Sequence, residues 1–394
     1  MDVQSYSDHW TLDPSITFLN HGSFGACPRA VLTAQQIWRT RLEQEPVRFF
    51  SLELEALLDA ARQKLAAFVG ANPEQLAFIP NATTGVNTVL RSLRFQSGDE
   101  LLTTNHEYNA SCNALTFAAQ QSAAKVVVAE VPFPLESADQ IVEAVLAKVS
   151  SRTKLVLLDH VSSQTALIFP IQPLIQQLAT QGIDVLIDGA HAPGMVALNL
   201  QELGAAYYTG NCHKWLCAPK GSAFLYVRQD RQALIRPLVI SHGANSPRTD
   251  RSRFRLEFDW MGTSDPSPYL CIPTAIQTIE SLMLGGWSAV MAHNRSVALQ
   301  VRNALCQQFQ IPLPCPDTMI GSMAAIPFFS GSAAALQTEL FERFQIEIPV
   351  NAWSNSERLI RFSVQLYNQR IDYDVLAEAL TVLHLEEARL GLRA

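Results

Sequence analysis

KLVLLD (Lys154–Asp159) and DVLID (Asp184–Asp188) are two short apolar runs, and the segment between them, Pro173–Gln181, has helical periodicity. Neither run alternates apolar and polar residues, so both faces of each strand are expected to be buried. Burial on both faces is typical of a parallel sheet covered by helices, with right-handed crossovers between neighbouring strands. This stretch therefore predicts an α/β fold with a mainly parallel central sheet flanked by helices.

The same alternation of strands and helices extends outward from this stretch in both directions. Further strands are expected at Gln75–Pro80, Glu100–Thr103, Lys125–Val131, Ala205–Thr209 and Ser222–Val227. Further helices are expected at Thr84–Leu93, Asn109–Ser122 and Ser137–Val149. These elements indicate one large domain, which we place at residues 46–268.

A smaller α+β domain is expected after the loop Ser241–Asp265, which is rich in proline, glycine and arginine. Its helices are expected at Ile272–Met283, Ser288–Phe309 and Tyr373–Leu385, and its strands at Met323–Pro327, Ile346–Pro349 and Leu359–Ser363. We place this domain at residues 269–394 and expect residues 1–45 to pack with it.

The composition is that of a globular protein and argues against several classes of function. Of the 394 residues, 48% are hydrophobic and 16% are charged, which is too apolar for a disordered chain. The net charge of -7 and the lack of a long basic run favour neither nucleic acid nor an anionic membrane as a partner. Seven scattered cysteines without a C-x-x-C pair indicate free buried thiols rather than a disulfide framework or a metal site. No leader peptide or membrane span is evident, so we expect a cytoplasmic protein.

Lys214 is the first candidate catalytic residue. It lies in Thr209-Gly-Asn-Cys-His-Lys214-Trp-Leu-Cys-Ala-Pro-Lys-Gly221, between two expected strands. A lysine held at a strand end, beside a histidine and small residues, can reach the aldehyde of a cofactor. Lys220 is a nearby rival, and a solvated loop lysine is the ordinary alternative.

Two further segments are candidates for holding such a cofactor. Asp188 ends its strand and therefore faces the crevice in which α/β proteins bind ligands, where a carboxylate favours a protonated ring nitrogen. Asn81-Ala-Thr-Thr-Gly-Val-Asn87 lies between a strand and a helix, so Thr83, Thr84 and Gly85 would present backbone N–H groups to a phosphate. A capping aspartate and an ordinary capped helix are the alternatives.

An aromatic residue and an arginine complete the pattern. His106-Glu-Tyr108 follows a short strand, and the Tyr108 ring could stack on a cofactor. Arg361 is flanked by apolar residues in a strand, so its guanidinium needs a buried partner, which a substrate carboxylate would provide in bidentate geometry. A packed tyrosine and an internal salt bridge are the alternatives. The joint order of these motifs favours a cofactor site, since each lies at an expected strand edge.

These motifs resemble those of the class V aminotransferases, which belong to fold type I of the pyridoxal phosphate (PLP) enzymes. The resemblance is strongest to the isopenicillin N epimerase-like group and more distant to the cysteine desulfurases. It implies the fold type I transferase fold, with residues 46–268 as the PLP-binding domain. It rests on Phe18-Leu-Asn-His-Gly-Ser-Phe-Gly25, Asn81-Ala-Thr-Thr84, His106-Glu-Tyr108, Ser162-Ser-Gln-Thr165, Asp188-Gly-Ala-His191-Ala-Pro-Gly194, Gly210-Asn-Cys-His-Lys214-Trp, Arg361-Phe-Ser363 and Tyr367-Asn368.

The resemblance implies a role for each candidate cofactor-binding residue. Lys214 would hold PLP as a Schiff base, Asp188 would pair with the ring nitrogen, and Tyr108 would stack on the ring. The ring hydroxyl would contact His191 and either Ser163 or Gln164. The phosphate would contact His213, Thr83, Thr84 and Thr209.

The resemblance also implies a substrate site and a partner. Arg361 would clamp the α-carboxylate of an amino acid, and His21 is a second candidate for contact with the substrate. Trp260-Met-Gly-Thr263 resembles the segment that family dimers lend to the phosphate site of the neighbouring subunit. A homodimer with shared active sites is therefore implied.

Such a site would remove the Cα proton of an amino acid, with Lys214 as the base and the ring as the electron sink. Three reactions can follow from the resulting carbanion, and all three stay open. Reprotonation from the opposite face gives an epimerase, which the resemblance favours and which needs a second acid such as Tyr108 or His21. Loss of a β-substituent gives a cysteine or cystine C–S lyase, and protonation on the cofactor gives an aminotransferase. A non-catalytic protein with the PLP fold is less favoured because Lys214, Asp188 and Arg361 are all present.

One departure from the family pattern is informative. Desulfurases carry a nucleophilic cysteine on a loop ahead of the arginine motif, whereas the segment from Glu347 to Arg361 has none. A persulfide-forming desulfurase is therefore disfavoured. Candidates for lining the side-chain pocket of the substrate are Phe49, Phe50, Arg255 and Trp260.

Overall fold

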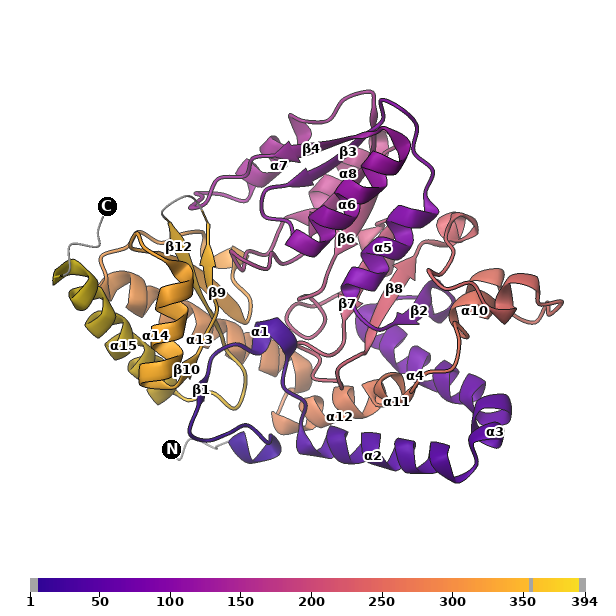
Figure 1. Ribbon diagram of the computed structural model, residues 1–394, viewed down its shortest axis with the longest axis horizontal. Coiled ribbons are helices and arrows are strands. Elements are labelled where there is room, and N and C mark those ends of the chain that lie inside the picture. The colour runs from indigo at the N-terminus through magenta and orange to yellow at the C-terminus, as the bar shows by residue number, and fades with distance from the viewer. Residues whose placement is uncertain (1–5, 354–356, 390–394) are drawn as a thin grey trace.

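A seven-stranded sheet forms the centre of the larger part of the chain (Figure 1). The computed structural model describes residues 6–353 and 357–389, so the ends of the expected domains and residues 354–356 lie outside the described residues. The strand order is β2-β8-β7-β6-β5-β3-β4, and only β8 runs antiparallel to its neighbours. The mainly parallel sheet is confirmed. Its strands are β2 (Leu76–Ile79), β3 (Glu100–Thr104), β4 (Lys125–Ala129), β5 (Thr153–Asp159), β6 (Asp184–Asp188), β7 (Tyr207–Asn211) and β8 (Ala223–Val227).

Helices cover both faces of this sheet, which explains why its strands are apolar on both sides. On one face, Val86 of α5 and Leu115 of α6 join a buried cluster with Leu157 of β5. On the other face, Leu174 of α8 packs in a second cluster with Val156 of the same strand. The helices of this part are α2 (Arg29–Gln44), α3 (Pro46–Arg48), α4 (Leu54–Val69), α5 (Ala82–Ser92), α6 (Asn109–Ser122), α7 (Asp139–Leu146), α8 (Ile171–Thr180), α9 (Leu200–Leu203), α10 (Arg253–Phe258), α11 (Ser267–Leu270) and α12 (Ile272–Leu282).

The C-terminal part is built on a three-stranded antiparallel sheet with the order β11-β12-β9. Its strands are β9 (Met323–Phe328), β11 (Val350–Ala352) and β12 (Arg358–Ser363). Its helices are α13 (Gly286–Gln308), α14 (Ala333–Phe344) and α15 (Arg370–Arg389). A separate two-stranded pairing joins β1 (Thr17–Phe18) in parallel to β10 (Ile346–Glu347).

The short helix α1 (His21–Phe24) lies between the two sheets in Figure 1. The backbone N–H of Gly22 donates to Ser363 Oγ in β12 at 3.0 Å. On the other side, His21 Nε2 lies 3.1 Å from the carbonyl oxygen of Lys214, which follows β7. The N-terminal segment therefore contacts both the large sheet and the small one.

The structure corrects the sequence-based elements in three places. The expected loop Ser241–Asp265 contains α10, whose N-terminus is capped by Ser252 Oγ. The strand expected at Ile346–Pro349 is only β10, and it pairs with β1 rather than joining the small sheet. The elements that were not expected from the sequence include α2, α4, α14 and β11. The remaining expected strands and helices are present, with ends that shift by no more than four residues.

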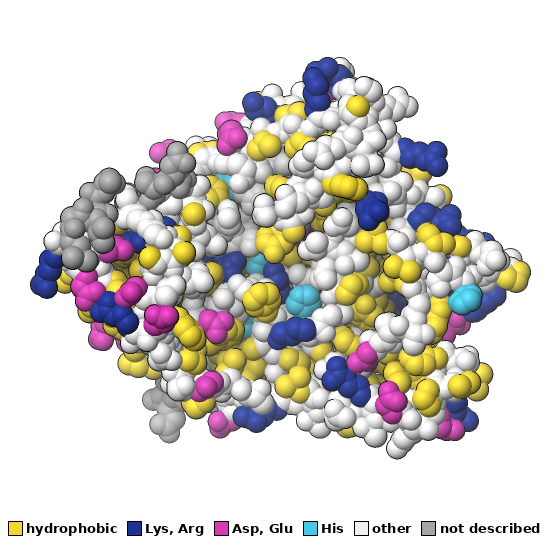
Figure 2. All heavy atoms as spheres, viewed as in Figure 1, with side chains coloured by type: hydrophobic (Ala, Val, Ile, Leu, Met, Phe, Trp, Pro, Cys, Tyr) yellow, Lys and Arg dark blue, Asp and Glu magenta, His cyan; other side chains and the backbone are white. Residues whose placement is uncertain are grey.

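Figure 2 shows histidine and basic side chains gathered near the middle of the face on which α1 lies in Figure 1. The seven cysteines are free thiols, and all but Cys112 are buried. Within the described residues, no helix is both long and apolar enough to cross a bilayer.

Candidate active site

The carboxyl ends of β5, β6 and β7 meet at one edge of the sheet. The register places Asp188 beside Asp159 on one side and Thr209 on the other. Asp188 is buried, and its two oxygens accept hydrogen bonds from Ser111 Oγ (2.8 Å) and from the Ala190 N–H (3.1 Å). Burial raises the pKa of Asp188 above its usual value, although its two hydrogen bonds and the charge of Lys214 act in the opposite direction. Among the described residues no cation forms an ion pair with it. The site therefore favours a cationic or N–H-bearing group opposite this carboxyl.

Lys214 is the lysine that reaches this edge. Its Nζ lies 3.2 Å from His191 Nε2, whereas the rival Lys220 donates to the carbonyl oxygen of Gly25 at 2.7 Å. Burial, aided by the positive charge of Arg361, lowers the pKa of the Lys214 amine to about 8. A substantial fraction of the amine is therefore unprotonated near neutral pH, as a nucleophile or base requires.

The protonation of His191 follows from its neighbours. Trp215 Nε1 donates to His191 Nδ1 at 3.4 Å, and an indole N–H cannot accept, so Nδ1 is unprotonated. The ring proton is then on Nε2, where it can donate to a neutral Lys214 amine. Burial holds the pKa of His191 well below its usual value, in agreement with a neutral ring.

The expected phosphate segment forms a tight helix start. Asn81 caps α5 by accepting from the Thr84 N–H at 2.8 Å and from Thr84 Oγ1 at 3.0 Å. A Cβ atom added to Gly85 would lie 2.3 Å from Thr209 Oγ1, so only glycine allows the helix to approach β7 this closely. Thr209 Oγ1 itself donates to the Phe224 carbonyl at 3.1 Å. The N-terminus of α5, with Thr83 partly exposed, offers backbone N–H groups at this edge.

His213 is held beside Lys214 by its ring. Its Nδ1 lies 2.9 Å from the Ser222 carbonyl oxygen, so Nδ1 carries a proton and donates. Burial lowers the pKa of His213 to about 4, which leaves Nε2 unprotonated in the neutral ring. The geometry gives His213 a fixed orientation next to the candidate lysine.

Arg361 reaches the site from β12 of the small sheet. It is 4% exposed, and its guanidinium donates to the Ser163 carbonyl oxygen (2.6 Å), Ser23 Oγ (2.9 Å) and Asn20 Oδ1 (3.3 Å). It makes no ion pair with a carboxylate of the described residues, and its Nε has no hydrogen-bond partner there. Burial lowers its pKa to about 10. An internal salt bridge is therefore not what holds this cation.

Ser163 and Gln164 lie in the turn after β5. Ser163 contacts Arg361 through both its carbonyl oxygen and its Oγ, the latter at 3.4 Å, so this residue faces the arginine. Gln164 is partly exposed in the same turn. Either residue remains a candidate for the ring hydroxyl that the resemblance implies.

The two candidates for a second acid, Tyr108 and His21, differ in their exposure and in their hydrogen bonds. Tyr108 immediately precedes α6, is 46% exposed and lies within electrostatic reach of Arg361. His21 is fully buried, with Nδ1 2.9 Å from Tyr367 Oη and Nε2 3.1 Å from the Lys214 carbonyl oxygen. Burial lowers its pKa to about 3. Both nitrogens of His21 are engaged, which leaves neither free to contact a substrate.

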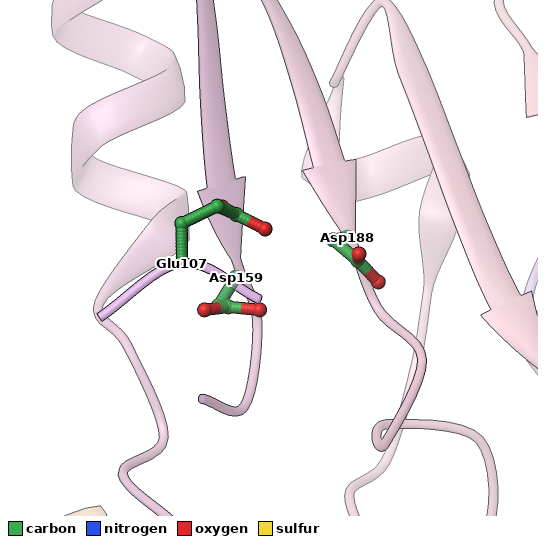
Figure 3. A group of neighbouring side chains, drawn as sticks. All are labelled: Glu107, Asp159 and Asp188. Atoms are coloured by element: carbon green, nitrogen blue, oxygen red, sulfur yellow. The ribbon is translucent and has the colours of Figure 1, made fainter. Parts of the chain in front are cut away.

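Two buried acids at this edge were missed by the sequence reasoning. Glu107 and Asp159 lie beside Asp188, and an oxygen from each of the three lies within 4.8 Å of the other two (Figure 3). The available signals were that Asp159 ends its strand as Asp188 does and that Glu107 directly precedes Tyr108. Ser111, which holds Asp188, lies one helical turn after Tyr108 and was missed as well.

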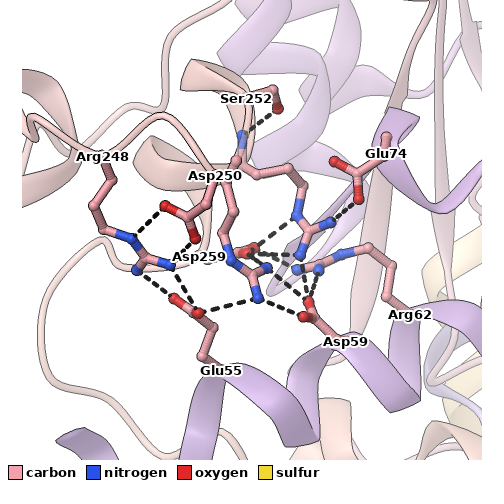
Figure 4. A network of polar contacts seen from close by, with 10 residues as sticks. Glu55, Asp59, Arg62, Glu74, Arg248, Asp250, Ser252 and Asp259 are labelled. Carbon is pink, nitrogen blue, oxygen red and sulfur yellow. Dashed lines mark hydrogen bonds and ion pairs between the residues drawn. The ribbon is translucent and has the colours of Figure 1, made fainter.

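An ionic network that includes Asp259 lies just ahead of the segment that carries Thr263 (Figure 4). Arg255 is buried and pairs with Asp59, with Glu74 at 2.5 Å and with Asp259 at 3.0 Å. It also lines a surface pocket together with Phe50 and Trp260, and its contact with a substrate stays a prediction. Thr263 itself is exposed. The network as a whole comprises Arg62, Arg248, Arg251 and Arg255 with Glu55, Asp59, Glu74, Asp250 and Asp259.

Comparison with known proteins places the chain in a family. The family described as aminotransferase class-V matches residues 25–376. The chain is 35% identical over 388 residues to isopenicillin N epimerase of Amycolatopsis lactamdurans, covering 95% of this chain and 96% of that protein. It is 30% identical to a probable chloroplastic L-cysteine desulfhydrase of Arabidopsis thaliana, covering 97% and 85%.

Among solved structures, the cysteine desulfurase CsdA of Escherichia coli has the same fold. Its TM-score is 0.77 at 22% identity, and the match covers 96% of this chain and 98% of that one. The fold type I fold predicted from the motifs is confirmed. Because the family match spans most of the chain and the epimerase relative aligns over nearly its whole length, the chain belongs to the class V aminotransferase family.

Proposed function

We propose that the chain is an amino-acid epimerase of the isopenicillin N epimerase kind. The cofactor of its family is pyridoxal 5′-phosphate. The observation that carries the proposal is the pairing, at one sheet edge, of a lysine of lowered pKa with a buried arginine that has no carboxylate partner. A base and an open cation are what an enzyme needs to deprotonate an amino acid while holding its carboxylate.

The residues present fit PLP. Asp188 offers a buried carboxylate for the ring nitrogen, Lys214 an amine for the aldehyde, and the start of α5 a set of N–H groups for the phosphate. When bound, PLP supplies an aldehyde that binds the substrate amine and a ring that withdraws electrons from Cα. His191 and His213 are positioned beside Lys214 for further contacts with the group.

In the proposed reaction, binding of the substrate and each proton transfer are carried out by different side chains. Arg361 holds the α-carboxylate and thereby fixes the orientation of the Cα–H bond. Lys214, already partly unprotonated, accepts the Cα proton. Tyr108 is the hydroxyl group best exposed to return a proton from a second direction, because His21 is occupied at both nitrogens. We therefore assign Lys214 and Tyr108 as the acid–base pair of the epimerisation.

A C–S lyase acting on cysteine or a related amino acid is the second candidate. It is favoured by the similarity to a protein named as a probable L-cysteine desulfhydrase and by the fact that β-elimination needs no second acid at Cα. Transamination uses the same base and the same clamp. Tyr108 separates the two leading candidates, since its hydroxyl is required for epimerisation alone.

The test is a panel of compounds supplied to the purified holoenzyme in deuterium oxide, comprising L-amino acids that include cysteine and cystine, together with isopenicillin N, the compound that the epimerase relative is named for. Product chirality, deuterium at Cα, sulfide and keto acid are measured together. Epimerisation gives a D-product with deuterium at Cα, and Tyr108→Phe abolishes it while leaving exchange of the L-substrate. Sulfide and pyruvate that survive Tyr108→Phe would reject the epimerase in favour of the lyase. A holoenzyme whose visible spectrum ignores every amino acid would reject catalysis altogether.

We further propose a homodimer in which Thr263 reaches the phosphate site of the neighbouring subunit. In support, Thr263 is exposed on a segment that lies just after Asp259 of the network of Figure 4. Phe24 and Val47, on α1 and α3, are exposed apolar residues that a second copy could cover. The test is to mix Lys214→Ala with Thr263→Ala chains, because each hybrid dimer contains one site free of both lesions. Activity that does not rise on mixing would contradict the shared site.

A further inference from the structure

Three carboxyl groups are packed together at the carboxyl edge of the large sheet (Figure 3). Asp159 ends β5, Asp188 ends β6, and Glu107 follows β3. One oxygen of each lies within 4.8 Å of the others, and their exposures are 3%, 2% and 6% in the same order. Like charges at this distance in a protein interior oppose one another, and each further ionisation becomes roughly a hundredfold less favourable.

The positive charge that acts on the cluster is that of Lys214, which lowers the pKa of Asp159 and of Asp188 but forms an ion pair with neither. None of the three carboxyls takes part in an ion pair among the described residues, and the nearest amine, Lys214, is hydrogen-bonded to His191. The other titratable groups facing the cluster are Cys112 of α6 and Tyr208 of β7. Burial raises the pKa of the Cys112 thiol to about 12 and that of Tyr208 well above its usual value, so both are neutral and neither compensates the acids.

The hydrogen bonds distinguish one acid from the other two. Both oxygens of Asp188 accept from donors, Ser111 Oγ and the Ala190 N–H. Glu107 Oε2 and Asp159 Oδ2 are buried and accept from no donor of the described residues. Thr103 Oγ1 is likewise buried without a well-formed hydrogen bond, but it lies close enough to the Glu107 carboxyl to lower its pKa, and Glu107 Oε1 accepts from the Tyr108 N–H at 3.3 Å. A buried carboxylate oxygen without a donor is costly, whereas a protonated carboxyl supplies the missing donor itself.

The electrostatics agree with this division. Burial and mutual repulsion raise the pKa of Glu107 and that of Asp159 well above their usual values. The pKa of Asp188 is raised by burial too, but its two hydrogen bonds and Lys214 act in the opposite direction. A proton entering the cluster therefore binds Glu107 or Asp159 before it binds Asp188.

We infer that Glu107 and Asp159 share a proton at neutral pH and act as positioning residues that keep Asp188 the ionised acid facing the cofactor ring. The inference rests on the proposed function in taking Asp188 as the partner of the ring nitrogen. The shared proton also lowers the charge of the cluster, because a proton held next to Asp188 prevents the three carboxyls from carrying three negative charges. An amide at position 107 or 159 imitates a protonated carboxyl, whereas an amide at 188 removes the ionised one.

The test is difference infrared spectroscopy of the holoenzyme at neutral pH, in water and in deuterium oxide. Glu107→Gln and Asp159→Asn should each remove or shift a protonated-carboxyl band that moves in deuterium oxide. Asp188→Asn should remove carboxylate bands instead. Glu130→Gln, an exposed acid on the same large part of the chain, is the matched control and should change carboxylate bands only. Because no substrate is added, failure of the proposed reaction would not alter these spectra.

Cofactor affinity provides the second readout. Glu107→Gln and Asp159→Asn should weaken PLP binding by only about threefold, and Asp188→Asn by roughly a hundredfold or more, as expected for loss of a buried charge partner. Absence of any protonated-carboxyl band in the wild-type difference spectra would overturn the inference. So would a Mn²⁺ or Mg²⁺ ion bound in one-to-one ratio by the wild-type holoenzyme but not by Glu107→Gln, since the cluster would then be a metal site.

Discussion

Replacement of Arg361 by glutamine separates binding from stability. In the absence of an amino acid, Arg361 is a buried cation with polar neighbours but no carboxylate among the described residues. Removing it loses four hydrogen bonds of about 1 kcal/mol each, but it also relieves the cost of burying an unpaired charge. We expect the free energy of unfolding to change by no more than about 1 kcal/mol.

The loss in amino-acid binding should be much larger. A bidentate guanidinium–carboxylate contact contributes two charge-assisted hydrogen bonds, each of about 1.5–3 kcal/mol. Part of this energy offsets the bonds that the guanidinium already makes, so we expect a net loss of about 3 kcal/mol, or roughly a hundredfold in the dissociation constant. Cofactor colour should persist, because the PLP-binding residues lie on the large sheet.

Arg358 provides a matched control on the same strand. It is 0% exposed and pairs with Glu387 through contacts of 2.9 and 2.5 Å. Breaking a buried pair leaves an uncompensated charge, which costs about 3 kcal/mol when the remaining acid is partly exposed, as Glu387 is. Arg358→Gln should therefore lower the free energy of unfolding by about 3 kcal/mol and leave the dissociation constant of the amino acid unchanged.

The assay is urea unfolding without amino acid, followed by titration of each holoenzyme with an L-amino acid while the visible band of the cofactor is recorded. The reasoning would be refuted if Arg361→Gln destabilised the protein as strongly as Arg358→Gln and bound the amino acid with wild-type affinity. Arg361 would then be a structural arginine.

Three further predictions concern the cofactor edge. Lys214→Ala should prevent borohydride from fixing PLP to the chain, whereas Lys220→Ala should not. Mass spectrometry of the reduced peptides shows whether PLP is attached. Fixation that persists in Lys214→Ala would reject the assignment. The Lys214 pKa is lowered to about 8, and a protonated amine cannot attack an aldehyde. The rate at which PLP attaches to the apoenzyme should therefore rise with pH and level off above about pH 8. A rate independent of pH would contradict a titrating Lys214. Gly85→Ala should cost about 1–3 kcal/mol of PLP affinity, because the added Cβ would clash, at the start of α5, with Thr209 Oγ1 and with Ile79. Equilibrium titration with PLP measures this loss, and an unchanged affinity would place the phosphate elsewhere.

Much of the large sheet could be predicted from local patterns. The apolar runs Lys154–Asp159 and Asp184–Asp188 proved to be neighbouring parallel strands, and the helix expected at Asn109–Ser122 has those bounds in the structure. These patterns succeed because burial on both faces and helical periodicity are properties of consecutive residues. α10 was missed for the opposite reason, since the charge of its Arg255 is neutralised by Asp59 of α4, which is far away in the sequence.

The candidate site, like the fold, could be predicted from the sequence only in part. The sequence alone identified Asp188, Lys214 and Arg361 by residue type and by their place at strand edges. It ranked Lys214 above Lys220 only by the neighbouring residues, because the contacts of the two amines, Lys214 with His191 and Lys220 with Gly25, are visible only in the structure. It also left His21 as a candidate acid, whereas the structure shows both of its nitrogens engaged by Tyr367 and the Lys214 carbonyl oxygen.

What only the tertiary structure decided is which charges face one another. Glu107 and Asp159 are unremarkable in the sequence, and they become neighbours of Asp188 because the strand order places β3, β5 and β6 side by side. Local sequence determines whether a segment is a strand and which side chain ends it. The proton affinity of that side chain depends on charges and donors that other strands bring within a few ångströms, and strand order is set by the packing of the whole chain.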